Sequence, residues 1–280
     1  MQKCFRPAGP LLGFPRFLHN TTTQHPAAGR TEPLLTTDYN PIVEQYQRSK
    51  QQPWRVCIES FTLMELVGDP TGLTVLDLAC GEGFYSRLLR HRGAARVTGL
   101  DLSAGMIAQA EAQEARQPLG VRYAVADARE LSGDNPVDLA VAAYLLNYAR
   151  TPVELQAMCD GIARSLKPGG RFVTVNTNPA FAFPSAPCYR KYGFQTEAVG
   201  EWGEGAPVRW TFHLDDGSFT IENYHLSVAS HEEALRRAGF RDIRWHPPVL
   251  SPDAPAEQDH DFWSTLLEFP PLAFIECIKD

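Results

Sequence analysis

The sequence predicts an α/β fold: a doubly wound parallel sheet with an aromatic-rich insert after its fifth strand. From residue 74 onward, short apolar segments alternate with amphipathic segments of helical length. The first apolar segment runs directly into a glycine-rich turn, "VLDLACGEGFYS" at residues 75–86. The alternation then pauses over residues 179–226, which contain ten aromatic residues. Strands separated by helices in this way form parallel sheets.

The elements before the insert are predicted in chain order. Residues 38–68 form a helical region interrupted near Pro53. Five strands are expected at 74–80, 96–102, 121–128, 137–144 and 171–177. Three helices are expected between them, at 84–93, 103–115 and 151–166. Ser103 and Thr151 are typical N-cap residues, and Glu154 is placed to close a capping box with Thr151.

The elements after the fifth strand are predicted with one interruption. Within the insert, residues 208–226 are expected to form a β-hairpin that turns on Asp216 and Gly217. A helix follows at 230–240, with Ser230 and Glu233 as a second capping box. Strands are expected at 242–250 and 272–279, with a polar loop at 251–261. The predicted parts are an N-terminal extension (1–37), a ligand-binding core (38–178), a cap insert (179–226) and a C-terminal completion of the sheet (227–280).

The charge of the chain is negative and unevenly placed. The formal net charge is −7 at pH 7. The first 31 residues contain four basic residues and no acidic one, so the rest of the chain carries 22 basic and 33 acidic side chains. Such a surface repels a polyphosphate backbone, so we expect no nucleic acid as a partner.

Apolar runs and cysteines indicate the compartment. No apolar run approaches the roughly 18–20 residues that span a bilayer, so no membrane partner is expected. The six cysteines are scattered without a Cys-x-x-Cys pair, which predicts a reducing, cytoplasmic compartment, no disulfide framework and no metal site. Residues 1–37 are expected to be a disordered or arm-like extension, with a targeting segment or a misassigned start as the alternatives.

The glycine turn discriminates between classes of ligand. A dinucleotide-binding turn has the pattern G-x-G-x-x-G, with the pyrophosphate on the following helix N-terminus. Here the register is Asp77-x-Ala79-x-Gly81-x-Gly83, and the third glycine of that pattern is missing. A P-loop needs a lysine followed by serine or threonine, and the turn has none. Neither phosphate-binding pattern fits.

S-adenosylmethionine fits the turn better, because it carries no phosphate. The carboxylate of Asp77 suits the ammonium of this ligand, directly or through water. The small residues Ala79, Gly81 and Gly83 let the backbone approach the sulfur and the ribose. The helix N-terminus that follows is electropositive and favours the carboxylate of the ligand.

Two further acids end the next two predicted strands. Asp101 closes the second strand, where a ribose diol needs a bidentate acceptor. Asp127 ends the third strand, where its carboxylate can accept from the amino group of adenine. A single acid at a strand end is most often a solvated carboxylate, but three in succession beside a glycine turn predict a nucleoside site.

The motifs together resemble a known family. The segments "VLDLACGEG", "GLDLSAGMI", "VADA", "AAYLLNYA" and "LKPGGRFV" are similar in order and spacing to class I S-adenosylmethionine-dependent methyltransferases, over roughly residues 55–178. The chain looks most like bacterial secondary-metabolite small-molecule methyltransferases of the toxoflavin-biosynthesis N-methyltransferase type. The resemblance implies a Rossmann-like, seven-stranded sheet whose last strand is antiparallel.

The resemblance also implies a set of cofactor contacts. The positions that match the motifs of the family are Asp77, Ala79, Gly81, Gly83, Asp101, Leu102, Met106, Asp127, Ala128, Ala143 and Tyr144. Tyr39 and Tyr46 are expected to supply an aromatic ring over the methionine end of the cofactor. Ala79 is a departure, because many members have glycine there, but it is a small one.

The predicted function is in-line methyl transfer to a small, natural-product-like molecule at N, O or C. Such a reaction needs a base only where the nucleophile carries a proton of high pKa. The candidates for that role are Tyr148, Tyr192, His213 and His225. The aromatic insert is expected to cover an apolar substrate pocket, with the core of a small cap or a dimer face as the alternative.

Two other readings of the sequence remain. A non-catalytic scaffold that binds S-adenosylmethionine would keep the glycine turn without turnover. A nicotinamide-dependent oxidoreductase is disfavoured by the missing glycine. The sequence leaves the formation of a homodimer undecided.

Overall fold

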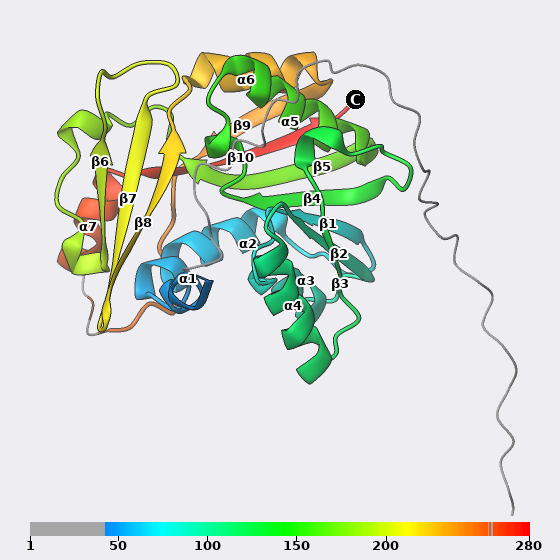
Figure 1. Ribbon diagram of the computed structural model, residues 1–280, viewed down its shortest axis with the longest axis horizontal. Helices are drawn as coiled ribbons and strands as arrows, with labels where there is room; N and C mark the ends of the chain where they lie inside the picture. Colours follow the sequence, from blue (N-terminus) through cyan, green and yellow to red (C-terminus); the bar gives the residue numbers. More distant parts are fainter. Residues whose placement is uncertain (1–42, 257, 259) are drawn as a thin grey trace, which may run out of the picture. The chain divides into compact units, whose positions relative to one another are not determined.

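A seven-stranded sheet in the order β3-β2-β1-β4-β5-β10-β9 forms the centre of the fold (Figure 1). The computed structural model describes residues 43–280 except 257 and 259, and these lie within one compact unit. The strands of the sheet are β1 (Thr74–Leu78), β2 (Arg96–Asp101), β3 (Arg122–Val125), β4 (Val137–Ala143), β5 (Leu166–Thr177), β9 (Phe240–His246) and β10 (Leu272–Lys279). The predicted extension (1–37) and Tyr39 lie outside the described residues.

Strand pairing confirms the predicted fold class. β1 pairs in parallel with β2 and β4, β2 with β3, and β4 with β5. The last strand, β10, inserts between β5 and β9 and is antiparallel to both. The chain therefore has the Rossmann-like, doubly wound sheet with one antiparallel strand that the resemblance implied.

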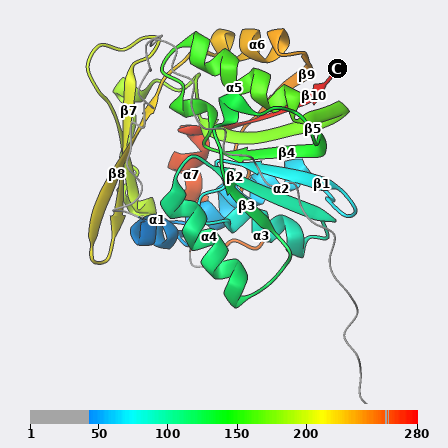
Figure 2. The same cartoon turned by 45° about the vertical axis from the view of Figure 1, so that its right-hand side comes forward.

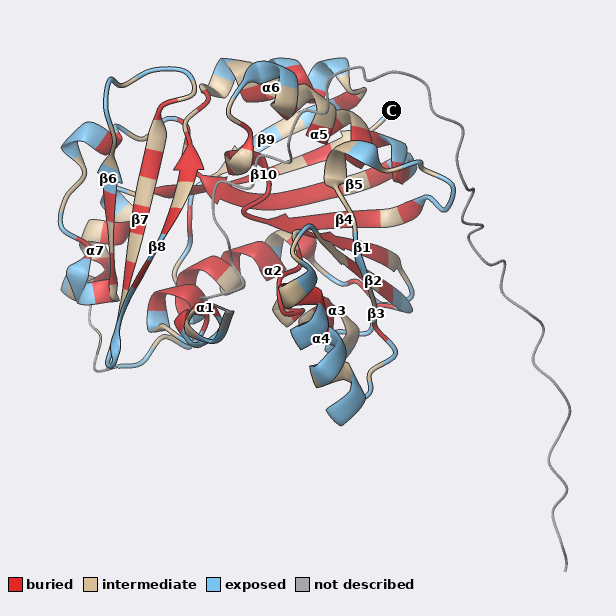
Figure 3. Cartoon of the chain, in the orientation of Figure 1, coloured by how far each residue is buried: buried red, intermediate tan, exposed pale blue. Residues whose placement is uncertain are grey.

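Helices cover both faces of this sheet (Figure 2). The helices are α1 (Val43–Ser49), η2 (Arg55–Ser60), α2 (Phe61–Val67), α3 (Phe84–His91), α4 (Ala104–Arg116), α5 (Pro152–Arg164), α6 (Val228–Arg237) and α7 (His260–Glu268). Buried side chains of α2 and α3 pack with Val75, Val141 and Val173 in one core, and those of α5 and α6 pack with Leu76 and Ala140 in a second core. Burial colouring shows the strands of the sheet buried between these helices (Figure 3).

A second, three-stranded antiparallel sheet stands at the end toward which β4 and β5 point (Figures 1 and 2). Its strands are β6 (Phe194–Ala198), β7 (Pro207–Leu214) and β8 (Gly217–Tyr224). Its buried face carries large apolar side chains, among them Phe194, Trp210, Phe212 and Phe219. These side chains belong to the same core as α2 and α3, so one apolar layer continues from the large sheet into this cap sheet.

Helix N-termini follow the predicted caps in two of three cases. Ser103 accepts from the Met106 N–H at 3.2 Å, and Thr151 accepts from the Glu154 N–H at 3.2 Å. The Glu154 carboxylate closes on the N–H of Arg150 at 2.7 Å, one residue earlier than the capping box requires. These short-range caps fix where α4 and α5 begin.

Two local predictions after β5 are wrong, and one helix was not predicted. The hairpin loop is Asp215–Asp216, because Leu214 pairs with Gly217. Helix α6 is capped by Ser227 rather than Ser230, since the helix begins at Val228 and the Ser227 hydroxyl accepts from the Ser230 N–H at 3.2 Å. Helix α7 follows the predicted polar loop and was not foreseen; its buried Trp263 packs in the aromatic core of the cap.

Two further findings concern the described part of the chain. Its five cysteines, Cys57, Cys80, Cys159, Cys188 and Cys277, are free thiols. None of the helices that the structure describes is long and apolar enough to span a bilayer.

Candidate active site

The three predicted acids lie along one edge of the large sheet. In the parallel register, Asp77 is level with Gly99 and Asp101 is level with Val125. Asp77 is therefore one residue from the end of β1, Asp101 is the last residue of β2, and Asp127 follows just beyond β3. The carboxyl ends of parallel strands are where α/β sheets bind their ligands.

The turn between β1 and α3 has an unusual backbone. Ala79, Gly81 and Gly83 all have positive φ, at 53°, 55° and 87°. Tyr144, directly after β4, also has a positive φ of 64°. A left-handed conformation costs roughly 1–2 kcal/mol for a residue other than glycine. Strain at the ends of two adjacent strands, β1 and β4, is typical of a functional site.

The two glycines of the turn serve different purposes. A Cβ on Gly83 would lie 2.8 Å from Cζ of Tyr123, so this glycine gives space to a side chain of β3. A Cβ on Gly81 would meet nothing nearer than the Met106 sulfur at 4.0 Å. Only Gly81 therefore leaves open space at the sheet edge, whereas Gly83 is needed for packing.

The carboxyl of Asp77 is buried and held in place. It is 1% exposed and accepts from the Ser86 hydroxyl at 2.5 Å, at the start of α3. Burial raises its pKa to about 7, against the opposing effect of the Ser86 hydrogen bond. A cationic ligand group would stabilise the charged carboxylate in this site.

Asp101 connects the glycine turn to the start of α4. One of its oxygens accepts from the Gly81 N–H at 2.8 Å and the other from the Ser103 N–H at 2.8 Å. Burial raises the pKa of this carboxyl. Beside it, the side chains of Leu102 and Val125 are 39% and 53% exposed, which places uncovered apolar surface at the ends of β2 and β3.

Asp127 already has a partner in the chain. Its carboxylate accepts from the Arg129 N–H at 2.9 Å and pairs with the guanidinium of the same residue. Burial would raise the pKa of Asp127, but the Arg129 contacts outweigh burial and hold it below its ordinary value. The adjacent Ala128 begins the short helix η3 (Ala128–Glu130), which α5 approaches closely: a Cβ on Gly161 would collide with the Ala128 carbonyl.

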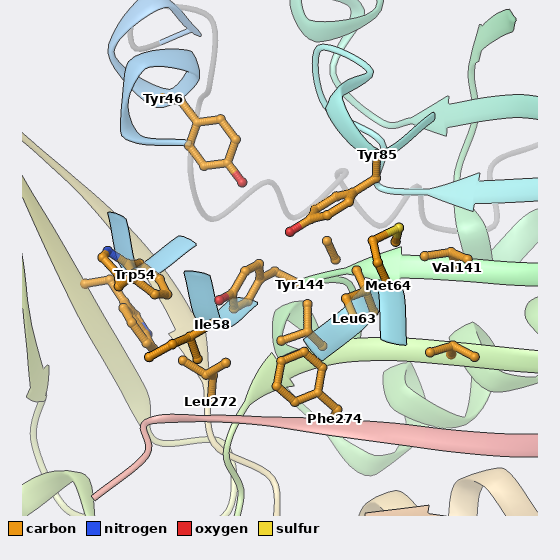
Figure 4. Packing of buried hydrophobic residues seen from close by; sticks show 14 of the residues in the cluster. Tyr46, Trp54, Ile58, Leu63, Met64, Tyr85, Val141, Tyr144, Leu272 and Phe274 are labelled. Atoms are coloured by element: carbon orange, nitrogen blue, oxygen red, sulfur yellow. The ribbon is translucent and has the colours of Figure 1, made fainter. Parts of the chain in front are cut away.

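A buried carboxylate, Glu59, lies where the N-terminal helices meet the end of β4. It is fully buried and accepts from Arg55 at 2.8 Å, from the Tyr85 hydroxyl at 2.8 Å and from the Tyr144 hydroxyl at 2.6 Å. Tyr46 of α1, predicted to cover the methionine end of the cofactor, lies beside Tyr85 and Tyr144 (Figure 4). Ala143, the residue before Tyr144, is buried at the end of β4.

The four candidate bases do not all lie together, although Tyr192 and His213 line the same crevice. The Tyr192 hydroxyl donates to the Phe262 carbonyl and accepts from the Leu266 N–H, which ties it to α7. Tyr148 is half-buried in η4 (Leu146–Tyr148), directly after β4, and packs against the core on the α5 side.

The two histidines differ in environment. The His225 ring stacks on Trp202 with 4.3 Å between ring centroids, and its buried Nδ1 has no hydrogen-bond partner among the described residues. Burial lowers the pKa of His225, which favours the neutral imidazole that a base requires. His213 lines a crevice of about 410 Å³ between the end of α1, the cap hairpin and α7; Arg48, Gln52, Lys191 and Tyr192 line it as well.

Sequence reasoning missed three buried charged residues of this site. Lys50, Arg55 and Glu59 were not among the predicted residues, although Arg55 and Glu59 are opposite charges four residues apart in an apolar helical segment. Asn147 is 2% exposed, and neither its amide nitrogen nor its oxygen finds a partner within the described residues. No group of three histidine, cysteine or acidic residues in the described part of the chain could hold a metal ion.

The fold defines a class: a Rossmann-like protein whose glycine turn matches neither phosphate-binding pattern. Residues 75–170 match the family model described as "Methyltransferase domain". The chain is 25% identical over 185 residues to N-demethylindolmycin N-methyltransferase from Streptomyces griseus, covering 64% of this chain and 75% of that protein.

A second relative agrees in class, and a solved structure agrees in fold. The chain is 36% identical over 189 residues to the ubiquinone/menaquinone biosynthesis C-methyltransferase UbiE from Desulfotalea psychrophila, covering 65% of this chain and 72% of that protein. Its fold matches an amino pentose methyltransferase from Micromonospora echinaspora, solved with bound SAM, at a TM-score of 0.55 and 19% identity, over 90% of this chain and 100% of the other. The chain belongs to the S-adenosylmethionine-dependent methyltransferases, and S-adenosylmethionine is its cofactor.

Proposed function

We propose that this methyltransferase transfers the methyl group of S-adenosylmethionine to a small, natural-product-like molecule at N, O or C. The acceptor binds between the cofactor and the aromatic face of the cap sheet. The observation that carries this proposal is the direct connection between that face and the end of β4. Residues 179–226 are thus proposed to be a substrate cap.

Arg55 and Tyr46 make that connection. The Arg55 guanidinium carbon lies 5.8 Å from the ring centre of Tyr144 and 5.0 Å from that of Phe212 on the cap sheet. The ring of Tyr46 meets Phe219, also on the cap sheet, with 6.3 Å between centroids. An aromatic wall next to the methyl donor favours a planar or apolar acceptor, because such walls bind flat rings by burial and stacking.

We further propose how the cofactor lies along the edge. Its ammonium is received at Asp77, its ribose diol at Asp101, and its adenine against the uncovered surface of Leu102 and Val125. Asp127 is at the adenine edge but is paired with Arg129, so a contact to the adenine amino group uses a remaining lone pair of the carboxylate. Gly81 supplies the open backbone for the sulfur and ribose.

The names of the relatives support a small-molecule acceptor and leave its methylated atom undecided. One relative is an N-methyltransferase of N-demethylindolmycin and another a C-methyltransferase of ubiquinone and menaquinone biosynthesis. Methyl transfer from a sulfonium is an in-line displacement, so the protein mainly aligns the nucleophile with the methyl group and excludes water. His225 is the candidate base whose environment favours the neutral form.

Methyl transfer to a panel of acceptors tests the proposal. The purified chain is incubated with S-adenosylmethionine carrying a trideuterated methyl group and a panel of heteroaromatic, quinol and amino-sugar acceptors. We expect one acceptor class to gain the labelled methyl group while S-adenosylhomocysteine accumulates in equal amount. The Asp101→Ala variant is the matched control and is expected to lose this activity.

The two other readings predict different results. Cofactor binding without transfer to any acceptor would favour a non-catalytic scaffold. Binding of NADH in place of S-adenosylhomocysteine would favour an oxidoreductase and contradict the proposal.

A further inference from the structure

Two polar side chains on the inward face of the cap sheet have no hydrogen-bond partner. Thr196 of β6 and Trp210 of β7 pair across the two strands, so their side chains are neighbours on one face of the sheet. They are 4% and 2% exposed. Within the described part of the chain, neither the Thr196 hydroxyl nor the Trp210 Nε1 finds a partner. A buried polar group without a partner costs free energy, so a pair of them calls for a group that the described residues do not supply.

The position of this pair in the cap points to the proposed acceptor site. Strand pairing places the two residues in the middle row of the inward face. The row on one side contains Phe212, which meets the Arg55 guanidinium of η2. The row on the other side contains Asn223, whose side-chain oxygen lies 3.5 Å from the Thr177 hydroxyl at the end of β5. The middle row therefore lies between two places where this face meets the rest of the chain, in the part of the cap where we place the acceptor.

A short helix lies over part of the middle row. Phe183 of η5 (Phe183–Ser185) packs against the Trp210 ring, with 6.4 Å between ring centroids. Phe183 itself is buried, but Ala182 and Pro184 on either side of it are exposed. A shift of this short helix would open Trp210 to a ligand.

The two side chains specify the kind of ligand group. An indole N–H can only donate a hydrogen bond, and a threonine hydroxyl can donate one as well. A carbonyl oxygen has two lone pairs, so it can accept from both donors at once. The middle row carries no charged side chain, so transfer of a carboxylate or a phosphate into it would be costly. An uncharged carbonyl is therefore the group that the row fits best.

We propose that the Trp210 N–H and the Thr196 hydroxyl bind a carbonyl oxygen on the edge of a flat acceptor molecule. The inference rests on the proposed function, in which the acceptor lies against this face of the cap sheet. The two residues thereby position the acceptor and favour ring compounds that carry a carbonyl over those that do not. In the free chain both groups are unpaired, and the acceptor supplies their partner when it binds.

Calorimetric titration with matched ring compounds tests this role. Oxindole and chromanone carry a ring carbonyl, whereas indoline and chroman have a methylene group in its place. In the presence of S-adenosylhomocysteine, we expect the wild-type chain to bind each carbonyl compound at least about fivefold more tightly than its partner. Thr196→Val should weaken binding of the carbonyl compounds by about three- to tenfold and leave their partners unchanged. Trp210→Phe should also weaken the carbonyl compounds more than their partners.

Thr211→Val is the matched control, because Thr211 lies on the outer face of the same strand and its hydroxyl meets that of Thr220 at 3.4 Å. It should leave all four affinities unchanged. A carbonyl preference that survives both Thr196→Val and Trp210→Phe would overturn the inference and leave the proposed function standing. Equal affinity of the wild-type chain for both members of each pair would do the same. Binding of none of the four compounds would contradict an acceptor site on this face, and with it the proposed function.

Thermal unfolding tests the same assignment without an acceptor. Thr196→Val removes an unpaired hydroxyl at nearly constant volume, so the midpoint of unfolding should stay the same or rise. Thr174→Val is the comparison, because Thr174 is also buried in a strand but its hydroxyl accepts from the Asn176 Nδ2 at 3.0 Å. That variant should lower the midpoint by about 2–4 °C. An equal loss in Thr196→Val would mean that its hydroxyl is already paired, within the chain or by a buried water, and would overturn the inference.

Discussion

The sheet edge around Asp101, where we propose that the cofactor binds, is held by contacts between nearby residues, whereas the cap sheet is held by contacts between distant ones. At the edge, Asp101 bonds Ser103 two residues away and Gly81 twenty residues away. In the cap, the Tyr192 hydroxyl bonds residues of α7 that are 70 and 74 positions further along the chain. The edge is thus formed by two adjacent strands and their turns, while the cap needs α7 for its completion.

Because of this difference, we expect substitutions in the cap and substitutions at the sheet edge to change different properties of the protein. Substitutions in the apolar layer of the cap remove packing shared with the core under the large sheet, so they should reduce the free energy of unfolding. Substitutions of the strand-end acids should chiefly reduce cofactor affinity.

The largest effect is expected from Trp263→Ala. Trp263 is fully buried in α7 and stacks on Tyr192 with 5.9 Å between ring centroids. Truncating a buried tryptophan typically costs about 3–5 kcal/mol of unfolding free energy. Denaturant unfolding measures this, with Phe269→Ala as the control, because Phe269 is 51% exposed and should cost less than about 0.5 kcal/mol. Equal costs for the two variants would mean that α7 does not complete the cap.

Gly83→Val should destabilise the fold next most strongly. The new side chain would meet the Tyr123 ring and would have to adopt a φ of 87°. Overpacking and backbone strain each cost about 1–3 kcal/mol. Gly81→Ala is the comparison, since its Cβ meets no atom closer than 4.0 Å and only the strain at φ 55° applies. Chemical denaturation should therefore give Gly83→Val a much lower free energy of unfolding than Gly81→Ala. Relative to the unfolding free energy that each variant loses, Gly81→Ala should lose more affinity for S-adenosylhomocysteine. The reverse ranking would make Gly83 the ligand-facing glycine.

Local patterns explain why the sequence could predict that Asp77 and Asp101 share one edge of the sheet, whereas their contacts to the cofactor stay a prediction. Parallel strands end at a common edge, so the spacing of Asp77 and Asp101 was sufficient to bring them together. The caps at Ser103 and Thr151 are made by residues three positions away. The family match follows from the same short segments.

Longer-range contacts explain what could not be predicted. Ser227 caps α6 together with Glu204, 23 residues earlier, so the nearer Ser230 and Glu233 pair was misleading. Gly217 was predicted to lie in the hairpin turn, but the two aspartates before it form the loop and Gly217 is the first residue of β8. Glu59 is 85 residues from its partner Tyr144, and no sequence pattern connects them.

Asp101→Ala should cost about 1–3 kcal/mol of cofactor binding, because it removes the proposed ribose acceptor. It also leaves the N–H groups of Gly81 and Ser103 without their acceptor, so some stability is lost as well. Titration with S-adenosylhomocysteine measures the affinity, and Asp134→Ala, at an exposed position, is the control. Unchanged affinity in a folded Asp101→Ala chain would show that the ribose is not held there.

The pH dependence of binding gives the smallest and most specific effect. Burial raises the pKa of Asp77 to about 7, so below pH 7 most free chains carry a protonated carboxyl. A ligand ammonium prefers the carboxylate, so binding releases a proton and affinity should rise by up to about tenfold per pH unit until pH 7, then level off. Asp77 contributes the opposite trend to the stability of the free chain: between pH 4 and 7 its native carboxyl binds more protons than the unfolded one, so its contribution to the unfolding free energy falls as pH rises. Titrations of S-adenosylhomocysteine between pH 5.5 and 8.5 measure the first trend. Asp77→Asn should bind more weakly at pH 8 and with a flat profile, and a slope that survives in this variant would assign the proton to another group at the methionine end.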